Sequence, residues 1–457
     1  MMKKTIFRTV CLLIVFSVFL AFSTPVSALS FDDLPNTDGA KCVYFYNIDA
    51  KRIVTKKGGG VKISPASSVK IMTGLLACEL LSDRLDETVT ITKEMIRATE
   101  GTRMKLAEGD KLTARALLYG AVCGGFNDAA YALAAACAGS YTEFVSLMNA
   151  RAAELGAKDT RFVNPTGYDA VGQYTTLEDV ALIAKAAIKN ELYMEISSTV
   201  SKKLEYLNGK EPFTLHNRNG LIGSYYANGY VNKYSEGMIA GVTDLGGHCV
   251  ITKATVDDTA YLCIVMGGAE SNGRITSYEI ANDLISYAKN KLGNVCLMKE
   301  GELICRIPVD SALEGAATDE NGDYLNVRTL SDTLAFMPLD TDMQGLSYRY
   351  HLYSDRLTAP ISAGRIVGTL DFYLDGEYLT STPLAVNADV TENGFAKKME
   401  EMRSAIVSRT TIITLVCLAI LLILRQLYFN NHKRKKVTEL RLKRYGNDDY
   451  QSNRGKR

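Results

Sequence analysis

Residues 64–74 of the chain, SPASSVKIMTG, place a lysine three positions after a serine, as Ser67 and Lys70. Residues three apart share one face of a helix, so this lysine can reach this serine hydroxyl. A serine hydroxyl needs an adjacent base to attack a carbonyl carbon, and a neutral amine can act as that base. Pro65 suits a first helical turn, and the N–H groups of a helix N-terminus stabilise negative charge forming beside Ser67. The pattern predicts an acyl-transfer nucleophile.

The spacing alone is weak evidence for that chemistry. At ordinary usage of the two residue types, about two S-x-x-K matches are expected by chance in a chain of this length. A second match does occur, from Ser286 to Lys289, in a late helical pattern that offers no supporting context. The alternative reading of Ser67 and Lys70 is therefore two polar residues at the start of a helix.

Other catalytic chemistries have little support in the sequence. The four histidines are scattered without ligand spacing, so we predict no metal site, no cofactor and no Ser-His-Asp triad. The cysteines outside the chain ends show neither a C-x-x-C pair nor a dense disulfide framework, and we interpret them as mostly buried thiols. They are Cys42, Cys78, Cys123, Cys137, Cys249, Cys263, Cys296 and Cys305.

Both ends of the chain have the composition of membrane-related segments. Residues 1–28 combine basic residues, a short apolar run and small residues before Leu29, which predicts a cleaved signal peptide. An uncleaved anchor is the alternative. Residues 410–429 are almost wholly apolar and long enough to form a transmembrane helix.

The charge distribution predicts the topology. Residues 430–457 hold ten Lys or Arg against three acidic residues, so this basic tail is expected in the cytoplasm. The whole chain has a formal charge of only +1, so residues 29–408 are acidic. An acidic exported part excludes nucleic acid as a partner. We expect a single-pass protein of the cell membrane with its main domains on the extracytoplasmic side, and the partner of the tail is unknown.

The order of the predicted elements indicates two domains before the membrane segment. Residues 29–292 begin with a strand pair, continue with helical patterns, and end with strands and a helix, which predicts one α/β domain whose sheet joins both ends. Residues 293–392 contain short β-rich runs separated by Gly, Asp and Pro, which predict a smaller all-β domain. Residues 393–409 read as a linker helix.

The segment ISPASSVKIMTG resembles the nucleophile motif of the serine-type D-alanyl-D-alanine carboxypeptidases. These are the low-molecular-mass penicillin-binding proteins, related to class A β-lactamases. The segments RMKLAEGDKLTARALLYG, NDAAYALA, DTRFVNPTGYDA and YTTLEDVALIAKAA follow the family in order and spacing, and APISAGRIVGTLDFYLDG resembles its C-terminal β-domain. The resemblance covers residues 35–390 and implies a penicillin-binding-protein fold.

The resemblance also implies an activity and a set of site residues. In this family a serine attacks the D-Ala-D-Ala bond of a peptidoglycan stem peptide, water releases the acyl-enzyme, and β-lactams are trapped as acyl analogues. Ser67 and Lys70 carry over as nucleophile and general base, and Asn127 as the asparagine of the S-x-N motif. The implied oxyanion hole is formed by the backbone N–H groups of Ser67 and Val242, with Gly241 allowing close approach.

Two of the three motifs are degenerate. Gly125 replaces the S-x-N serine, and Ile239 and Ala240 replace the lysine and threonine of K-T-G. Those residues pass a proton to the leaving amine and hold the substrate carboxylate in the family. With no cation at Ile239, we expect Lys70 to stay an ammonium into the alkaline range and to be a poorer base, unless burial of the amine offsets this effect by an amount that the sequence does not reveal.

These departures leave two hypotheses of different classes. One is a membrane-anchored carboxypeptidase with impaired or altered activity. The other is a non-catalytic pseudoenzyme that binds peptidoglycan or acts as a scaffold. A third idea, that Cys123 replaces the nucleophile, is disfavoured because it lies on an apolar helical run with no identified base.

Overall fold

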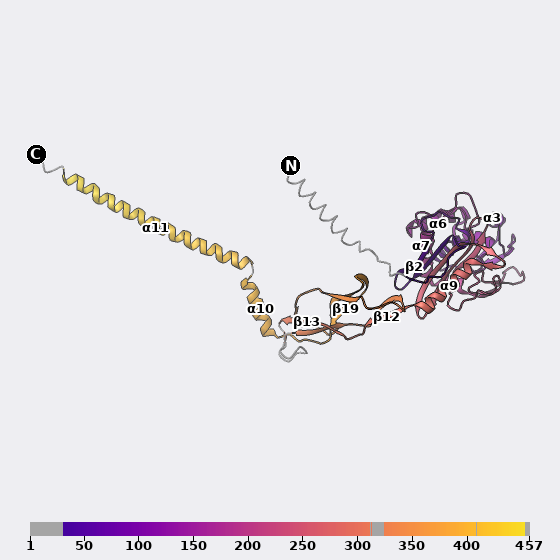
Figure 1. Ribbon diagram of the computed structural model, residues 1–457. Helices are drawn as coiled ribbons and strands as arrows, with labels where there is room; N and C mark the ends of the chain where they lie inside the picture. Colours follow the sequence, from indigo (N-terminus) through magenta and orange to yellow (C-terminus); the bar gives the residue numbers. More distant parts are fainter. Residues whose placement is uncertain (1–30, 311, 313–323, 408, 453–457) are drawn as a thin grey trace. The chain divides into compact units, whose positions relative to one another are not determined.

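The computed structural model describes residues 31–310, 312, 324–407 and 409–452 (Figure 1). The predicted signal peptide, 1–28, lies outside the described residues, as do residues 453–457 of the predicted tail. The chain divides into two compact units, Met1–Val295 with Phe336–Asp342 and Cys296–Ala335 with Met343–Arg457.

The first unit contains an antiparallel sheet in the order β2-β1-β9-β8-β7. Strands from both ends of the unit meet in it, as the sequence predicts, because β1 pairs with both β2 and β9. The strands are β1 (Cys42–Asn47), β2 (Arg52–Lys57), β7 (Ile239–Thr243), β8 (Gly247–Val256) and β9 (Thr259–Gly268).

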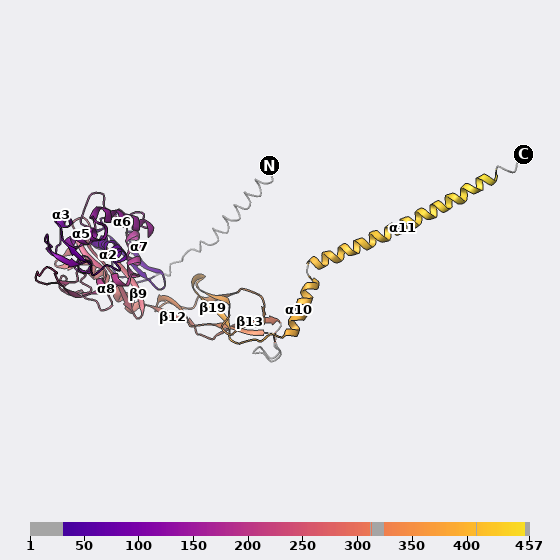
Figure 2. The ribbon, with the colours of Figure 1, turned by 180° about the vertical axis from the view of Figure 1, so that it is seen from behind.

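Alternation along the central strands gives the sheet two apolar faces. In β9, Leu262 and Ile264 belong to one buried cluster, whereas Cys263 and Val265 belong to another. Successive side chains of a strand point to opposite faces, so an unbroken apolar strand requires cover on both sides. Helix α9 (Thr276–Lys291) packs on one face (Figure 1), and helices of the first cluster lie on the other (Figure 2).

Several helices of the first unit begin where the sequence supplies a capping side chain. The hydroxyl of Thr113 accepts a hydrogen bond from the N–H of Ala116, and Asn190 Oδ1 accepts one from the N–H of Tyr193. Helix α5 (Asn127–Ala138) is followed by Gly139, whose φ of +80° favours glycine. The remaining helices are α2 (Val69–Leu80), α3 (Lys93–Arg97), α4 (Ala114–Val122), α5 (Asn127–Ala138), α6 (Tyr141–Glu154), α7 (Leu177–Ile188) and α8 (Glu191–Ser198).

Short strand pairs complete this unit. They are β3 (Thr88–Thr90) with β4 (Lys111–Thr113), β5 (Ser201–Leu204) with β6 (Phe213–His216), and β10 (Glu270–Ser271) with β11 (Arg274–Ile275). A separate two-stranded sheet, which does not belong to the first unit alone, consists of β12 (Leu292–Met298) and β15 (Thr333–Pro338).

The second unit is built on a sheet in the order β16-β18-β19-β14-β13-β17. Its own buried cluster includes Ile307, Leu370, Phe372 and Leu384. The predicted all-β domain is therefore present. The strands are β13 (Leu303–Asp310), β14 (Tyr324–Thr329), β16 (Leu346–Leu352), β17 (Leu357–Thr358), β18 (Ile366–Leu374) and β19 (Glu377–Val386).

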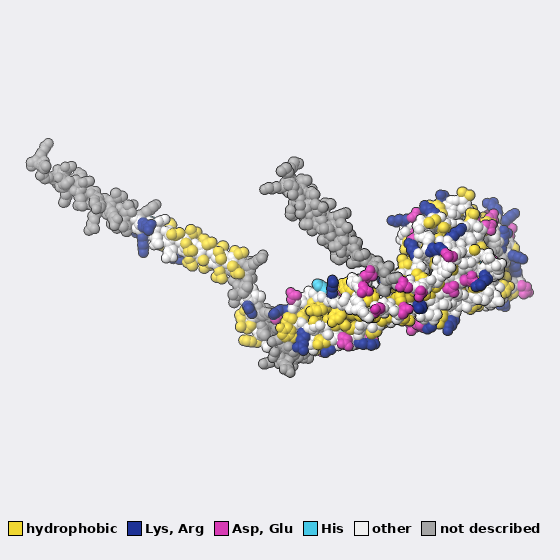
Figure 3. Space-filling model, in the orientation of Figure 1, with side chains coloured by type: hydrophobic (Ala, Val, Ile, Leu, Met, Phe, Trp, Pro, Cys, Tyr) yellow, Lys and Arg dark blue, Asp and Glu magenta, His cyan; other side chains and the backbone are white. Residues whose placement is uncertain are grey.

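Two helices follow the β-domain, α10 (Gly394–Val407) and α11 (Arg409–Ser452). Within α11, residues Ile412–Arg434 have a mean hydropathy of 2.3 in their most apolar stretch and no buried side chains there, so length and composition allow this helix to cross a membrane. Figure 3 shows its apolar side chains followed by basic ones. The helical segment predicted at 410–429 is thus a continuous apolar helix.

Candidate active site

Ser67 and Lys70 lie on two consecutive helical segments. Ser67 is the central residue of a 3₁₀ turn, η1 (Ala66–Ser68), and Lys70 is in the first turn of α2. Ser68 Oγ donates a hydrogen bond of 2.6 Å to the carbonyl oxygen of Pro65, which fixes the turn. Both Ser67 and Lys70 line one cleft, with Ser67 partly exposed and Lys70 buried. The structure therefore brings the predicted nucleophile and base together.

Lys70 is only 2% exposed, and its Nζ atom donates a hydrogen bond of 2.6 Å to the carbonyl oxygen of Thr166. Burial lowers the pKa of Lys70 from its ordinary value to about 7, with the charge of Arg218 acting in the same direction. The expectation that Lys70 stays an ammonium into the alkaline range is wrong. The lowering of the Lys70 pKa by desolvation outweighs the effect of losing the third-motif cation. The guanidinium of Arg218 is a second cation close enough to lower this pKa further.

The segment NPTG, residues 164–167, positions the carbonyl group that Lys70 contacts. Asn164 Oδ1 accepts hydrogen bonds from the N–H groups of Thr166 and Gly167, at 3.1 and 2.8 Å. Gly167 has φ of +80°, and a Cβ atom there would lie 1.8 Å from the carbonyl oxygen of Ala66. This turn therefore packs directly against the nucleophile turn, and only glycine fits at its close approach.

Strand β7 forms another part of the wall of the cleft that contains Ser67 and Lys70. Gly241, Val242 and Thr243 line it, and a Cβ atom on Gly241 would lie 2.1 Å from Ser67 Oγ. The backbone of β7 thus passes directly beside the nucleophile. Thr243 Oγ1 donates a hydrogen bond of 3.0 Å to Asp169 Oδ1, and this carboxylate also accepts one of 2.6 Å from Ser64. These contacts tie β7 to the segment before the nucleophile turn.

Asn127 begins α5 and also lines the cleft. Its Nδ2 atom donates a hydrogen bond of 2.6 Å to the carbonyl oxygen of Glu100, whereas its buried Oδ1 atom has no hydrogen-bond partner among the described residues. Gly125, at the serine position of the same motif, has φ of +68° and lines the cleft. A buried acceptor without a partner is costly unless a ligand supplies a donor.

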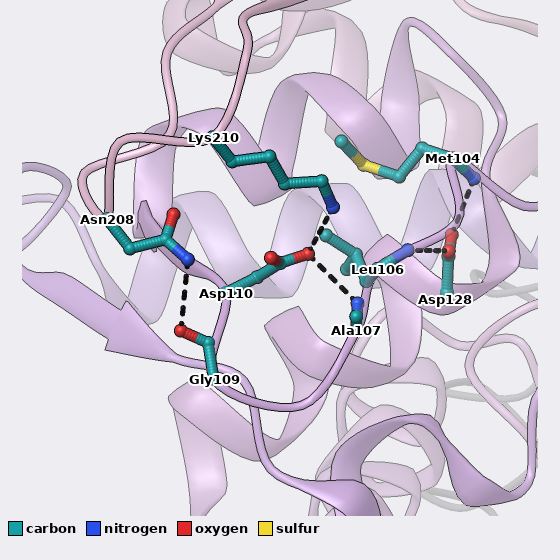
Figure 4. Close-up of polar contacts among 8 residues, drawn as sticks. All are labelled: Met104, Leu106, Ala107, Gly109, Asp110, Asp128, Asn208 and Lys210. Atoms are coloured by element: carbon teal, nitrogen blue, oxygen red, sulfur yellow. Dashed lines mark hydrogen bonds and ion pairs between the residues drawn. The ribbon is translucent and has the colours of Figure 1, made fainter.

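Gly101 and Thr102 also line the cleft. The loop that follows them is held by Asp128, whose contacts with Met104 and Leu106 are drawn in Figure 4. Its carboxylate accepts hydrogen bonds of 3.0 Å from the N–H groups of Met104 and Leu106. Further along the loop, Asp110 forms an ion pair of 2.6 Å with Lys210, and its carboxylate accepts a hydrogen bond from the N–H of Ala107. The sequence alone predicts no function for these two carboxylates.

The side chains at the two altered K-T-G positions supply no polar group. Ile239 is 1% exposed and belongs to the buried cluster beside α2, and Ala240 is 2% exposed and belongs to the cluster beside α9. Ala240 is among the residues that line the cleft, and Ile239 packs in the core. The structure therefore leaves this part of the cleft without the motif's cation and hydroxyl.

Two residues near the nucleophile were missed by sequence reasoning. Arg218 lines the cleft, and the buried thiol of Cys249 lies close enough to the backbone of Ser67 and to Lys70 to interact with both, although burial raises its pKa to about 11. Neither residue belongs to a recognisable motif, so only the tertiary structure assigns them to the site. Burial raises the pKa of Cys123 to about 12, and its thiol donates to the carbonyl oxygen of Thr199, which agrees with an inert core cysteine.

Together these elements form a cleft with a partly exposed hydroxyl, a buried amine that titrates near neutrality, a carboxamide and a glycine-lined strand. Such an arrangement suits acyl transfer through a serine ester. The fold and the residues of the cleft place the chain in the class of the low-molecular-mass penicillin-binding proteins.

Comparison with known proteins gives the family. The profile of the D-alanyl-D-alanine carboxypeptidases matches residues 35–270, and that of the C-terminal domain of penicillin-binding protein 5 matches residues 316–392. The chain belongs to the D-alanyl-D-alanine carboxypeptidase family. The resemblance stated from the motifs is thereby confirmed.

The similarity to individual relatives extends over both units of the chain. The chain is 27% identical over 362 residues to D-alanyl-D-alanine carboxypeptidase DacF of Bacillus subtilis, covering 78% of this chain and 87% of that protein. It is 28% identical over 389 residues to DacC of Escherichia coli, covering 83% and 90%. The crystal structure of penicillin-binding protein 5 from Haemophilus influenzae superposes with a TM-score of 0.57 at 23% identity, covering 78% and 99%, which shows the common fold.

Proposed function

We propose that the protein is a membrane-anchored D-alanyl-D-alanine carboxypeptidase that acts on peptidoglycan stem peptides through an acyl-Ser67 intermediate, with altered activity. The observation that carries this proposal is the buried Lys70, whose pKa of about 7 makes it a competent base in the cleft that it shares with Ser67. General bases work best when their pKa lies near the operating pH.

The proposed first step is acylation. Ser67 Oγ attacks the carbonyl carbon of the penultimate D-Ala while neutral Lys70 accepts the hydroxyl proton. The backbone N–H groups of Ser67 and Val242 stabilise the oxyanion, since that contribution needs no side chain. The terminal D-Ala leaves as the free amine after it takes the proton back from the Lys70 ammonium, and water then hydrolyses the ester of Ser67. Asn127 Oδ1, which lacks a partner among the described residues, is available to a substrate N–H.

The altered motifs are the reason for proposing altered activity. Loss of a proton relay at Gly125 slows a reaction by about 10² to 10⁴. Loss of the cation and hydroxyl at Ile239 and Ala240 weakens the binding of a substrate carboxylate. A strained β-lactam carbonyl needs less help than a peptide, so we expect acylation by β-lactams to survive better than peptide cleavage.

The anchor is also part of the proposal. The apolar helix Ile412–Arg434 supports a single membrane crossing, and the basic residues after it support a cytoplasmic C-terminus. The two folded units would then lie on the extracytoplasmic side, where peptidoglycan is found.

The burial of Ile239 and Ala240 in apolar clusters favours a second candidate function. A protein that keeps the fold and lacks turnover would be a peptidoglycan-binding or scaffold pseudoenzyme. Intact-protein mass spectrometry after incubation with benzylpenicillin separates the two candidates. We expect a mass increase of one penicilloyl group in the native protein and none in Ser67→Ala. If the native protein gains no mass, the acyl-serine function fails and the scaffold is the better description.

A further inference from the structure

The sheet of the second unit ends in a strand whose side chains are exposed on both faces. β16 lies at one edge of that sheet, and all its residues from Ser347 to His351 are exposed. In a sheet with a buried core, one face of each strand usually packs inward. Aromatic side chains that gather on such an exposed edge therefore indicate an interaction surface.

Five residues of this region form a row in which printed ring contacts connect the neighbours. The ring centroids of Tyr373 and Tyr378 lie 5.9 Å apart, and the guanidinium carbon of Arg349 lies 5.1 Å from the ring centroid of Tyr373. Further along β16, the ring centroids of His351 and Tyr353 lie 6.4 Å apart. We call these five residues, which come from β16, β18, β19 and the position after β16, the tyrosine stripe.

The register of β16 and β18 places the centre of the stripe on one face of the sheet. Ser347 lies opposite Tyr373, and Arg349 lies opposite Asp371. Residues directly opposite in an antiparallel pair share a face. His351 is on the same face as Arg349, because side chains two positions apart on a strand point the same way. The rings are thus bordered by a hydroxyl group and a carboxylate.

The stripe is as long as an extended segment of polymer. The N–H of Tyr353 donates a hydrogen bond of 2.9 Å to the carbonyl oxygen of Val367, which is six residues from Tyr373 along β18. Six residues of a strand span about 20 Å. An open row of this length suits a chain that lies along it, whereas small molecules bind in concave pockets.

Charge and ring chemistry decide which polymer the stripe fits. Arg349 and Asp371 face each other across the strands, so their charges balance and the surface complements an uncharged polymer. Faces that insert into lipid carry Trp, Phe or Leu, whereas every ring of the stripe carries a polar atom. Sugar rings present apolar C–H faces and hydroxyl edges, and amphipathic aromatic rings match both.

We propose that the tyrosine stripe binds the glycan backbone of peptidoglycan, an uncharged polymer of N-acetylated sugars. This inference goes beyond the proposed function and rests on it only for the choice of polymer, since the stem peptides that the cleft would take are attached to this backbone. Two sites on one chain for the same polymer raise the effective concentration at the second site once the first is occupied.

The test is a calorimetric titration of the full-length protein in detergent with the hexamer of N-acetylglucosamine, which has the sugar rings and no stem peptide. We expect saturable binding. Tyr353 and Tyr378 are 64% and 50% exposed, and Tyr353→Ala and Tyr378→Ala should each weaken binding by about tenfold. Tyr350→Ala is the matched control, because Tyr350 is 51% exposed in the same strand but points to the opposite face. Its affinity should stay within about twofold of the native value.

No binding of the hexamer by the native protein would overturn the proposal, even if the alanine variants fail to fold. An equal loss of affinity in Tyr350→Ala, or no loss in folded Tyr353→Ala and Tyr378→Ala, would do so as well. Analytical ultracentrifugation tests the rival occupant. If Tyr353→Ala converts a dimer into a monomer, the stripe is a surface between copies of the chain and the proposal is wrong.

The result is separable from the proposed activity, because the hexamer offers Ser67 no stem peptide. Penicilloylation of Ser67 without hexamer binding defeats only the stripe. Hexamer binding without penicilloylation supports the stripe and defeats only the acyl-serine step.

Discussion

A Cβ atom on Gly241 would lie 2.1 Å from the Oγ atom of Ser67, so the backbone of β7 and the nucleophile are in contact with no room for a side chain between them. This approach lets a backbone N–H group of β7 act on a carbonyl that Ser67 attacks. It also makes Gly241 the one third-motif residue that this chain cannot replace without moving its nucleophile.

Gly241→Ala is therefore expected to slow penicilloylation of Ser67 by about 10² or more, because the methyl group displaces either Oγ or the strand. Gly223→Ala is the matched control. The nearest atom to a Cβ on Gly223 would be Val200 Cγ1 at 3.5 Å, an ordinary contact. Rates are measured by intact-protein mass against time. Equal rates for Gly241→Ala and the native protein would show that β7 does not contribute to acylation.

The pH dependence of acylation follows from the titration of Lys70. Its pKa of about 7 means that the base becomes neutral as the pH rises through 7. We expect the second-order rate constant for acylation by benzylpenicillin to rise between about pH 6 and 8 and then to level off. A rate that continues to rise into the alkaline range would mean that Lys70 remains an ammonium at neutral pH.

The same titration predicts a pH-dependent stability. In the unfolded chain Lys70 keeps its proton to about pH 10, whereas in the folded protein it loses it near pH 7. Between these values the unfolded state binds more protons, so the unfolding free energy rises with pH. Relative to Lys70→Met, the native protein should gain up to about 1.4 kcal/mol per pH unit between pH 7.5 and 9.5.

Urea denaturation of both proteins at these two pH values measures that difference. The comparison with Lys70→Met cancels the other titrating groups, which both proteins share. A difference in stability between the two proteins that is independent of pH would show that the folded-state pKa of Lys70 is close to its ordinary value.

The carboxylate of Asp128 should be a structural requirement of the cleft. It is 2% exposed and accepts backbone hydrogen bonds from Met104 and Leu106, as drawn in Figure 4. Asp128→Ala leaves these buried donors unpaired and should lower the unfolding free energy by about 3 kcal/mol.

Asp86→Ala is the matched control for that substitution, since Asp86 is exposed and pairs only with Arg115 in the described structure. Its effect should be below about 1 kcal/mol. Urea denaturation measures the unfolding free energy of both variants. Similar decreases for the two would contradict the structural function of Asp128 in holding the loop that contains Met104 and Leu106.

The proposed topology predicts which part of the chain is accessible from outside the cell. Protease added to intact cells should digest residues 29–408 and spare a fragment that contains Ile412–Arg434 and the tail. Permeabilised cells should lose the tail as well. Protection of the folded units in intact cells would place them inside and exclude peptidoglycan as the substrate.

The sequence by itself determined the elements whose signals are local. Ser67 and Lys70 are three residues apart in consecutive helical turns, so their proximity follows from local helix geometry. The strands β8 and β9 and the helices α4 to α7 follow from apolar periodicity and from caps such as Thr113. The family followed from several motifs in a fixed order, since their joint occurrence is informative where one S-x-x-K is not.

The tertiary structure decided what depends on residues far apart in the chain. Thr166 is 96 positions from Lys70 and accepts its hydrogen bond, and Arg218 reaches Gly125 only because the segment after β6 returns to the end of α4. The sequence reveals the missing cation at Ile239 but not how strongly burial of the amine lowers the pKa of Lys70, so the expectation of a high pKa is wrong. Desolvation depends on all atoms packed around a group, and the fold alone brings those atoms together.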